Sequence, residues 1–231
     1  MEDKLIDGSI EVVCGPMFAG KTEELIRRAK RLKYAKKNYQ VFKPSIDDRY
    51  HKKNAIVSHS LLTEDAILID KAHDILKHLL PNTEAIIIDE AQFLDKEIIK
   101  IVNNLADQGI RVIVGGLDLN FRGEPFGPMP ELLALAESVT KLTAICLKTG
   151  LPATRTQRLI NGKPASYHDK LILVSANESY EPRTRSAHEV PDKPWVFHEW
   201  SFKRSEACFW ERWNSRRSSN CFRQSNYRKS P

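Results

Sequence analysis

The segment that most constrains the fold is a glycine-rich run between an apolar stretch and an amphipathic one. Residues 15–22 read GPMFAGKT, which fits the pattern G-x-x-x-x-G-K-[ST]. The apolar residues 10–14 precede this run, and a helical pattern begins near Thr22. A loop that joins a buried strand to a helix in this way presents backbone N–H groups to phosphate. Its lysine reaches the β- and γ-phosphates and its hydroxyl suits Mg²⁺. The run therefore predicts a nucleoside triphosphate site formed by Gly15, Pro16, Met17, Phe18, Ala19, Gly20, Lys21 and Thr22.

Two carboxylates after a second apolar run supply the other half of such a site. Residues 85–88 are Ala-Ile-Ile-Ile, and Asp89 and Glu90 follow directly. Because open α/β sheets bind ligands at the carboxyl ends of their strands, both acids are expected beside the phosphate loop. Asp89 would join Thr22 in holding Mg²⁺, and Glu90 is placed to accept a proton or to orient a nucleophile. Together the two motifs indicate a protein that uses a nucleoside triphosphate.

Apolar runs and amphipathic stretches alternate over the first 140 residues. The runs are rich in β-branched residues, as strands buried on both faces are, whereas the stretches between them show helical spacing. This alternation predicts an α/β fold of the P-loop NTPase type, with a mostly parallel sheet and helices on both faces, over residues 1–140. The expected strands are residues 10–14, 39–42, 66–69, 85–88 and 110–114, and the expected helices are residues 23–35, 72–80, 96–106 and 131–137.

The sequence pattern changes after residue 140, from long apolar runs and helical stretches to shorter segments. Residues 141–192 contain short strand candidates at 142–146 and 171–174, with a segment punctuated by glycine and proline between them. They predict a small β-rich module with a long, lasso-like loop. Residues 198–231 contain no Leu, Ile, Val or Met, so the tail at 193–231 lacks the material for a core and is expected to be disordered.

The net charge of +6 belongs to this tail, because residues 1–200 carry equal numbers of acidic and basic side chains. The body therefore shows no electrostatic sign of a nucleic acid partner, and the basic side chains of the first helix predict a solvated face. No apolar window is long enough for a membrane span, the N-terminus lacks a secretory pattern, and four scattered cysteines do not suggest a disulfide framework. We expect a cytoplasmic protein with neither a membrane nor a nucleic acid partner.

Six motifs, in order along residues 10–191, resemble those of the type II thymidine kinases. They are GPMFAGKTEELIRR at 15–28, FKP at 42–44 with DDRY at 47–50, DEAQF at 89–93, GLD at 116–118 with FRGEPFG at 121–127, TRTQRL at 154–159 and ESYEPR at 178–183. The resemblance implies transfer of the γ-phosphate of ATP, with Mg²⁺, to the 5′-hydroxyl of thymidine or deoxyuridine. It also implies a homotetramer that the end product dTTP inhibits.

The same resemblance implies roles for individual residues. Glu90 would take the proton of the 5′-hydroxyl, Arg49 and Arg158 would neutralise charge that develops on the phosphates, and Gln92 would lie at the ATP site. Apolar and aromatic walls with a few polar contacts suit a flat, weakly polar base. These walls would be Met17, Phe93, Leu117, Phe121, Thr156 and Tyr180, with the main chain of Leu171, Ile172, Leu173, Val174 and Ser175 along the pyrimidine edge.

The chain departs from the family pattern at the positions that usually bind a structural zinc. Relatives carry C-x-x-C followed by C-x-x-[CH], whereas this chain has Cys146 with Thr149, and Thr184 with Ala187. Tetrahedral Zn²⁺ needs four nitrogen or sulfur donors, and threonine is no substitute, so we expect no bound zinc. Ser175 also stands where relatives commonly have glycine. Both changes predict weaker thymidine binding or a less ordered loop, with the ATP site intact.

Two other functions fit the nucleotide motifs. A P-loop ATPase that acts on nucleic acid would bind the nucleic acid through the basic tail. This alternative predicts that DNA stimulates ATP hydrolysis and that DNA binding depends steeply on salt. A homologue with a damaged substrate module would bind ATP but form no dTMP.

Overall fold

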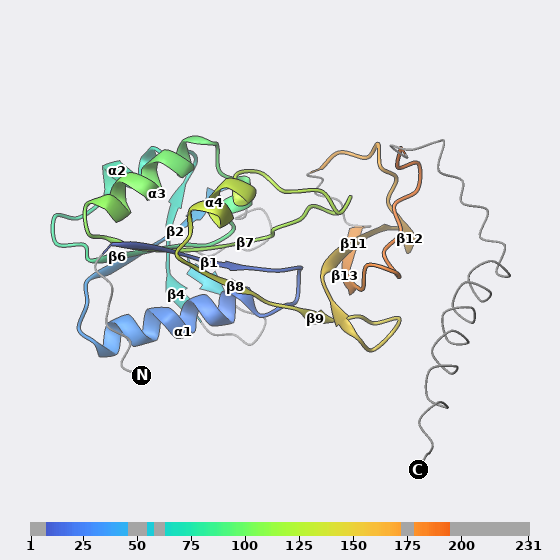
Figure 1. Ribbon diagram of the computed structural model, residues 1–231, viewed down its shortest axis with the longest axis horizontal. Helices are drawn as coiled ribbons and strands as arrows, with labels where there is room; N and C mark the ends of the chain where they lie inside the picture. The colour runs from blue at the N-terminus through green and yellow to red at the C-terminus, as the bar shows by residue number, and fades with distance from the viewer. Residues whose placement is uncertain (1–7, 46–54, 58–62, 172–177, 195–231) are drawn as a thin grey trace, which may run out of the picture. The chain divides into compact units, whose positions relative to one another are not determined.

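Six parallel strands form the central sheet of the computed structural model, which describes residues 8–45, 55–57, 63–171 and 178–194 (Figure 1). The order across the sheet is β5-β2-β6-β7-β1-β8, and every neighbouring pair is parallel. The predicted α/β fold with a mostly parallel sheet is confirmed. The strands are β1 Ser9–Cys14, β2 Tyr39–Pro44, β5 Ile67–Ile69, β6 Ala85–Ile88, β7 Arg111–Gly116 and β8 Ser138–Lys141.

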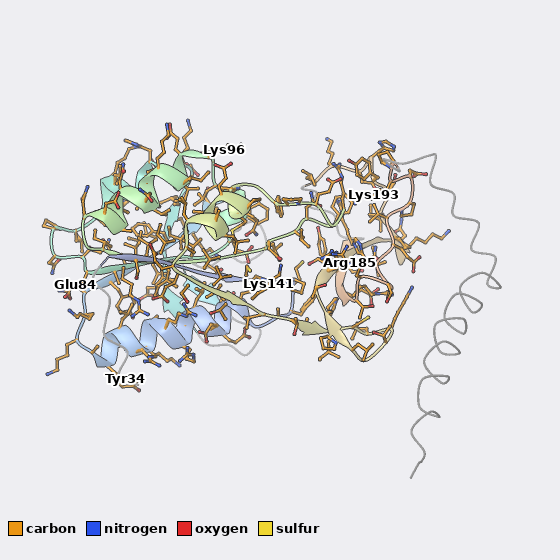
Figure 2. All side chains as sticks on the ribbon, in the orientation of Figure 1. Tyr34, Glu84, Lys96, Lys141, Arg185 and Lys193 are labelled. Atoms are coloured by element: carbon orange, nitrogen blue, oxygen red, sulfur yellow. The ribbon has the colours of Figure 1, made fainter. Side chains whose placement is uncertain are left out.

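Helices cover both faces of this sheet, because its inner strands are apolar on both sides. The helix α1, Lys21–Tyr34, covers one face, and α2 Asp74–His78, α3 Glu97–Asp107 and α4 Met129–Leu135 cover the other (Figure 1). Val12 and Val13 are both fully buried, Val12 in the core with α3 and Val13 in the core with α1. Successive strand residues point to opposite faces, so one apolar run serves two cores. Figure 2 shows Tyr34 and Lys96 on opposite sides of the sheet.

The carboxyl ends of the inner strands meet at one edge. Cys14 at the end of β1 pairs with Gly116 at the end of β7, and Ile88 at the end of β6 pairs with Val114. The phosphate motif, the acidic pair and the segment after β7 therefore leave the sheet side by side. This is the edge at which parallel α/β sheets bind ligands.

A small β-rich part follows β8. The strands β9 Ala144–Ile145 and β10 Pro152–Ala153 form an antiparallel pair, and β11 Arg155–Ile160 lies between β12 Lys163–Pro164 and β13 Glu178–Arg183. A separate antiparallel pair consists of β3 Ala55–Val57 and β4 Thr63–Asp65. The strand expected at 142–146 is shorter than predicted, and most of the one expected at 171–174 lies outside the described residues, as does the tail from residue 195.

Two kinds of strand escaped prediction from the sequence. The edge strand β8 is mostly exposed, so it lacks the continuous apolar run of an inner strand. The strand β11 buries Arg155, Thr156, Gln157 and Arg158, so its interior is polar and an apolar pattern cannot reveal it. Within the part of the chain that the structure describes, no helix has the length and apolar character needed to cross a bilayer.

Candidate active site

The loop between β1 and α1 has a backbone shape that requires glycine at its start. Gly15 has φ 147°, and a Cβ there would lie 2.4 Å from the carbonyl oxygen of Leu142. Real Cβ atoms do not approach backbone so closely, so position 15 admits only glycine. Gly20, with φ 81°, directly precedes the first residue of α1, Lys21. The loop therefore delivers Lys21 to a helix N-terminus, where the helix dipole adds to the positive charge.

A hydrogen bond joins the two sequence motifs across 67 positions. The hydroxyl of Thr22 donates to Oδ2 of Asp89 at 3.1 Å, and Oδ1 of the same carboxylate accepts the backbone N–H of Glu90 at 2.9 Å. Lys21 is nearly buried and donates from Nζ to the carbonyl of Pro16 at 2.9 Å. A hydroxyl and a carboxylate are the oxygen donors that Mg²⁺ prefers, so Thr22 and Asp89 fit this ion.

The glycine end of β7 makes room for the side chains that follow β6. The strand β7 lies between β6 and β1, so these side chains must pass over its end to reach the phosphate loop. A Cβ at Gly115 would lie 2.5 Å from Cδ1 of Leu25 and 3.2 Å from Oδ1 of Asp89, and one at Gly116 would lie 2.7 Å from Oε1 of Gln92. A side chain at 116 would therefore displace the amide of Gln92, and one at 115 would displace Leu25 and crowd the carboxylate of Asp89.

Glu90 is held in a strained backbone conformation and by a specific neighbour. Its φ of 53° and ψ of 37° fall in the left-handed region, which costs a non-glycine residue about 1–2 kcal/mol and recurs at functional sites. Gln92 is 3% exposed; its Nε2 donates to the Glu90 carboxylate, and its Oε1 accepts the N–H of Leu117 at 2.9 Å. Gln92 thus ties Glu90 to the end of β7. Its predicted contact with ATP stays a prediction.

The residues expected around the base come from both parts of the fold. Phe93 lies in the turn after β6, and its ring packs edge-on against that of Phe126, with ring centroids 5.7 Å apart. Thr156 on β11 is 3% exposed, and its Oγ1 accepts the N–H of Met17 in the phosphate loop at 3.0 Å. The structure therefore brings β11 directly to the phosphate loop. Tyr180 lies opposite Arg158 in the pairing of β13 with β11.

Phe121 lies beside two arginines, and its predicted place in the wall around the base stays a prediction. Its ring is 5% exposed, with the guanidinium of Arg158 at 5.0 Å from its centroid and that of Arg122 at 5.4 Å. Arg158 is fully buried and donates to the carbonyl of Lys170 at 2.5 Å. These contacts place Arg158 at the base of the loop that begins near Leu171. Its phosphate role stays a prediction, and Arg49, Ile172, Leu173, Val174 and Ser175 lie outside the described residues.

The positions that bind zinc in relatives surround one buried sulfur. Cys146 is 1% exposed. Burial alone would raise the pKa of its thiol, but hydrogen bonds from the Thr149 hydroxyl and from the backbone of Thr184, Thr149 and Lys148 outweigh burial and lower the pKa to about 6. Ala187 packs against the same small cluster. One thiolate, two hydroxyls and a methyl group do not fit tetrahedral Zn²⁺. The hydrogen bonds to Cys146 stand where metal bonds would be.

An ion pair that the sequence analysis did not assign crosses the end of β1. Oδ2 of Asp118, a residue that is 5% exposed, lies 2.8 Å from Nζ of Lys141, and this pairing raises the pKa of the lysine. Burial and the negative charge of Asp118 together raise the pKa of the Cys14 thiol to about 11, so the thiol stays protonated. Lys141 stands at the end of β8 (Figure 2). Asp118 belongs to the GLD motif at 116–118, and that motif is the sequence signal that could have indicated this residue.

Comparison with known proteins gives a family assignment. The family model for thymidine kinase matches residues 8–188. Among solved structures, the chain is similar to domain III of the Thermotoga maritima replication initiation protein DnaA, at 15% identity and a TM-score of 0.36 over 59% of this chain. The chain covers only 56% of that structure's length. It is also similar to the genome packaging NTPase B204 of Sulfolobus turreted icosahedral virus 2, at 19% identity and a TM-score of 0.39 over 58% of this chain and 74% of that one.

The family match spans the phosphate loop, the acidic pair after β6, the GLD segment and the polar strands β11 and β13. These are the elements that the geometry gathers at one edge of the sheet. The chain belongs to the thymidine kinase family.

Proposed function

We propose that the chain transfers the γ-phosphate of ATP to the 5′-hydroxyl of thymidine or deoxyuridine. Family membership supports a nucleoside kinase, and the proposal adds the substrate and the catalytic roles. One observation carries it: Glu90 directly follows Asp89, which is hydrogen-bonded to Thr22 of the phosphate loop. A hydroxyl that gives its proton to Glu90 would therefore lie next to the phosphate that it attacks.

Each group at the sheet edge has a part in this reaction. The loop at residues 15–20 and Lys21 hold the triphosphate, and Thr22 and Asp89 hold Mg²⁺. When bound, this ion neutralises negative charge on the phosphate oxygens. Glu90 accepts the 5′-hydroxyl proton as the new O–P bond forms and the bond from the γ-phosphorus to the bridging oxygen breaks, which releases ADP.

The remaining parts of the proposal concern recognition and regulation. Phe93, Leu117 and Thr156 would enclose the base together with Met17 and Phe121, and Tyr180 would close the pocket from β13. The resemblance further implies a homotetramer and inhibition by dTTP. We propose both for this chain, with a cytoplasmic location and no nucleic acid partner.

Product formation from labelled thymidine, ATP and Mg²⁺ tests the proposal. We expect labelled dTMP and one ADP per dTMP, with thymidine titrated to reveal whether its binding is weakened by the changes at 149, 175, 184 and 187. ATP binding without dTMP, even with both ligands saturating, would leave only a nucleotide-binding homologue. ATP hydrolysis that DNA stimulates, without dTMP, would favour the nucleic acid ATPase.

Replacing Gln92 should reveal whether it serves Glu90 or ATP. Gln92→Met keeps the length of the side chain but removes both of its hydrogen bonds, to Glu90 and to the N–H of Leu117. We expect about a tenfold lower kcat, because lost orienting bonds of this kind cost about 1–3 kcal/mol, with little change in the KM for ATP. Steady-state kinetics measure both constants. An unchanged kcat with a raised KM for ATP would assign Gln92 to ATP binding instead.

A further inference from the structure

His188 connects two segments that the proposed function places around the nucleoside. It follows β13, and Nε2 of its imidazole lies 2.9 Å from the carbonyl oxygen of Phe121, 67 positions earlier. The ring packs over Gly123, where a Cβ would lie 3.4 Å from Cε1 of His188. The imidazole therefore reaches from the small β-rich part to the segment after β7.

The backbone around His188 is itself fixed to β11. The side chain of Gln157, 2% exposed, donates to the carbonyl of Glu189 at 2.9 Å and accepts the N–H of Glu189 at 2.8 Å. A buried amide that satisfies both backbone groups of one residue holds that residue as a strand neighbour would. His188 thus projects from a fixed point.

The imidazole also meets the backbone of Thr156. Burial, then the positive charges of Arg155 and Lys193, lower the pKa of His188, and hydrogen bonds to the backbone of Phe121 and Thr156 oppose them. Because a carbonyl oxygen can only accept, the imidazole donates this bond to Phe121 from Nε2. At the other end, the hydroxyl of Thr156 accepts the N–H of Met17 in the phosphate loop.

We propose that His188 is a positioning residue for the nucleoside pocket, holding the backbone of Phe121 at a fixed distance from Thr156. This inference rests on the proposed function, because it assigns Phe121 and Thr156 to that pocket. Without the imidazole, the carbonyl of Phe121 loses its donor, and the Phe121 segment can move relative to β11. The ATP site, anchored by Lys21, Thr22 and Asp89, keeps its own contacts.

The test compares His188→Ala with His188→Gln, whose amide retains a donor. We expect His188→Ala to raise the KM for thymidine about tenfold and to change the KM for ATP less than about twofold, since one lost hydrogen bond to a buried acceptor costs about 1–3 kcal/mol. His188→Gln should recover most of the loss. The matched control is His168→Ala, because His168 is exposed and contacts only Tyr167 among the described ring pairs.

Melting temperature and thymidine affinity by calorimetry complete the test. Equal rises in both KM values, a lower melting temperature in both His188 variants and no recovery by glutamine would reduce His188 to a folding role and overturn the proposal. Unchanged constants in His188→Ala would overturn it as well. If the wild type binds thymidine but forms no dTMP, the proposed reaction fails, and the thymidine affinities of the variants still decide the role of His188. If the wild type binds no thymidine, both proposals fail.

Discussion

Replacing Glu90 with glutamine is expected to lower the rate of dTMP formation by about 100- to 10,000-fold, the usual contribution of a general base. Glutamine keeps the shape of the side chain and still accepts the hydrogen bond from Gln92, but its amide cannot take the proton of the 5′-hydroxyl. The phosphate loop does not depend on this carboxylate, since Thr22 bonds to Asp89. We therefore expect a loss in kcat at an almost unchanged affinity for ATP, measured with labelled thymidine and by calorimetry.

Glu97→Gln provides the matched control for this substitution. Glu97 is an exposed residue at the start of α3, and the same change there removes a negative charge outside the site. We expect it to leave kcat within about twofold of the wild type, as surface substitutions usually do. A Glu90→Gln variant as active as this control would remove Glu90 from the reaction and leave the carboxylate a structural role.

Restoring three cysteines should give the chain a zinc site that its own residues do not form. The Thr149 hydroxyl and the backbone of Thr184 hydrogen-bond to the sulfur of Cys146, and Ala187 packs against the apolar cluster that contains Cys146. The combined change Thr149→Cys, Thr184→Cys and Ala187→Cys places four thiols around one point, which is a complete tetrahedral set. We expect about one zinc per chain by elemental analysis, against about none in the wild type. The melting temperature should rise by about 5–10 °C, because structural zinc stabilises the folded state.

The serine triple variant at 149, 184 and 187 separates metal binding from packing. It fills the same positions with small polar side chains but supplies no additional thiolate, so it should bind no zinc and gain no stability. Zinc in the wild-type protein at about one per chain would contradict the donor argument. A cysteine triple variant without zinc would show that the turns around Cys146 are arranged differently from a metal knuckle.

The arrangement of the candidate phosphate loop could be predicted from the sequence because its determinants are local. The glycines at 15 and 20 set the backbone, Lys21 and Thr22 follow at fixed positions, and the acids directly follow an apolar strand. The parallel register then brings these ends together without further information. The fold class followed in the same way, from apolar runs long enough to be buried on both faces of a sheet.

The proposed nucleoside side of the candidate site could not be derived in this way, because its interior is polar. The strand β11 buries two arginines, a threonine and a glutamine, and Thr156 and Gln157 have partners on segments distant in sequence. Gln157 pairs with Glu189, and His188 reaches Phe121, so no apolar period marks these residues. Likewise Gln92 gave no local sign that its amide would lie between Glu90 and Leu117. Only family resemblance pointed to this region, and it gave His188 no part in the nucleoside pocket.

The bond from Met17 to Thr156 makes the phosphate loop dependent on residues far downstream. A chain shortened after residue 140 would retain every residue of the glycine-rich motif, yet Met17 would lose its hydroxyl acceptor, Gly15 its packing against Leu142 and Asp118 its lysine. Removal of the whole segment would thus also disturb the proposed ATP site, whereas a change at His188 alone leaves the bond from Met17 to Thr156 in place. The phosphate motif therefore does not form a complete site without the residues that follow position 140. Transferring the first 140 residues alone to another protein would carry over the motif but not these contacts.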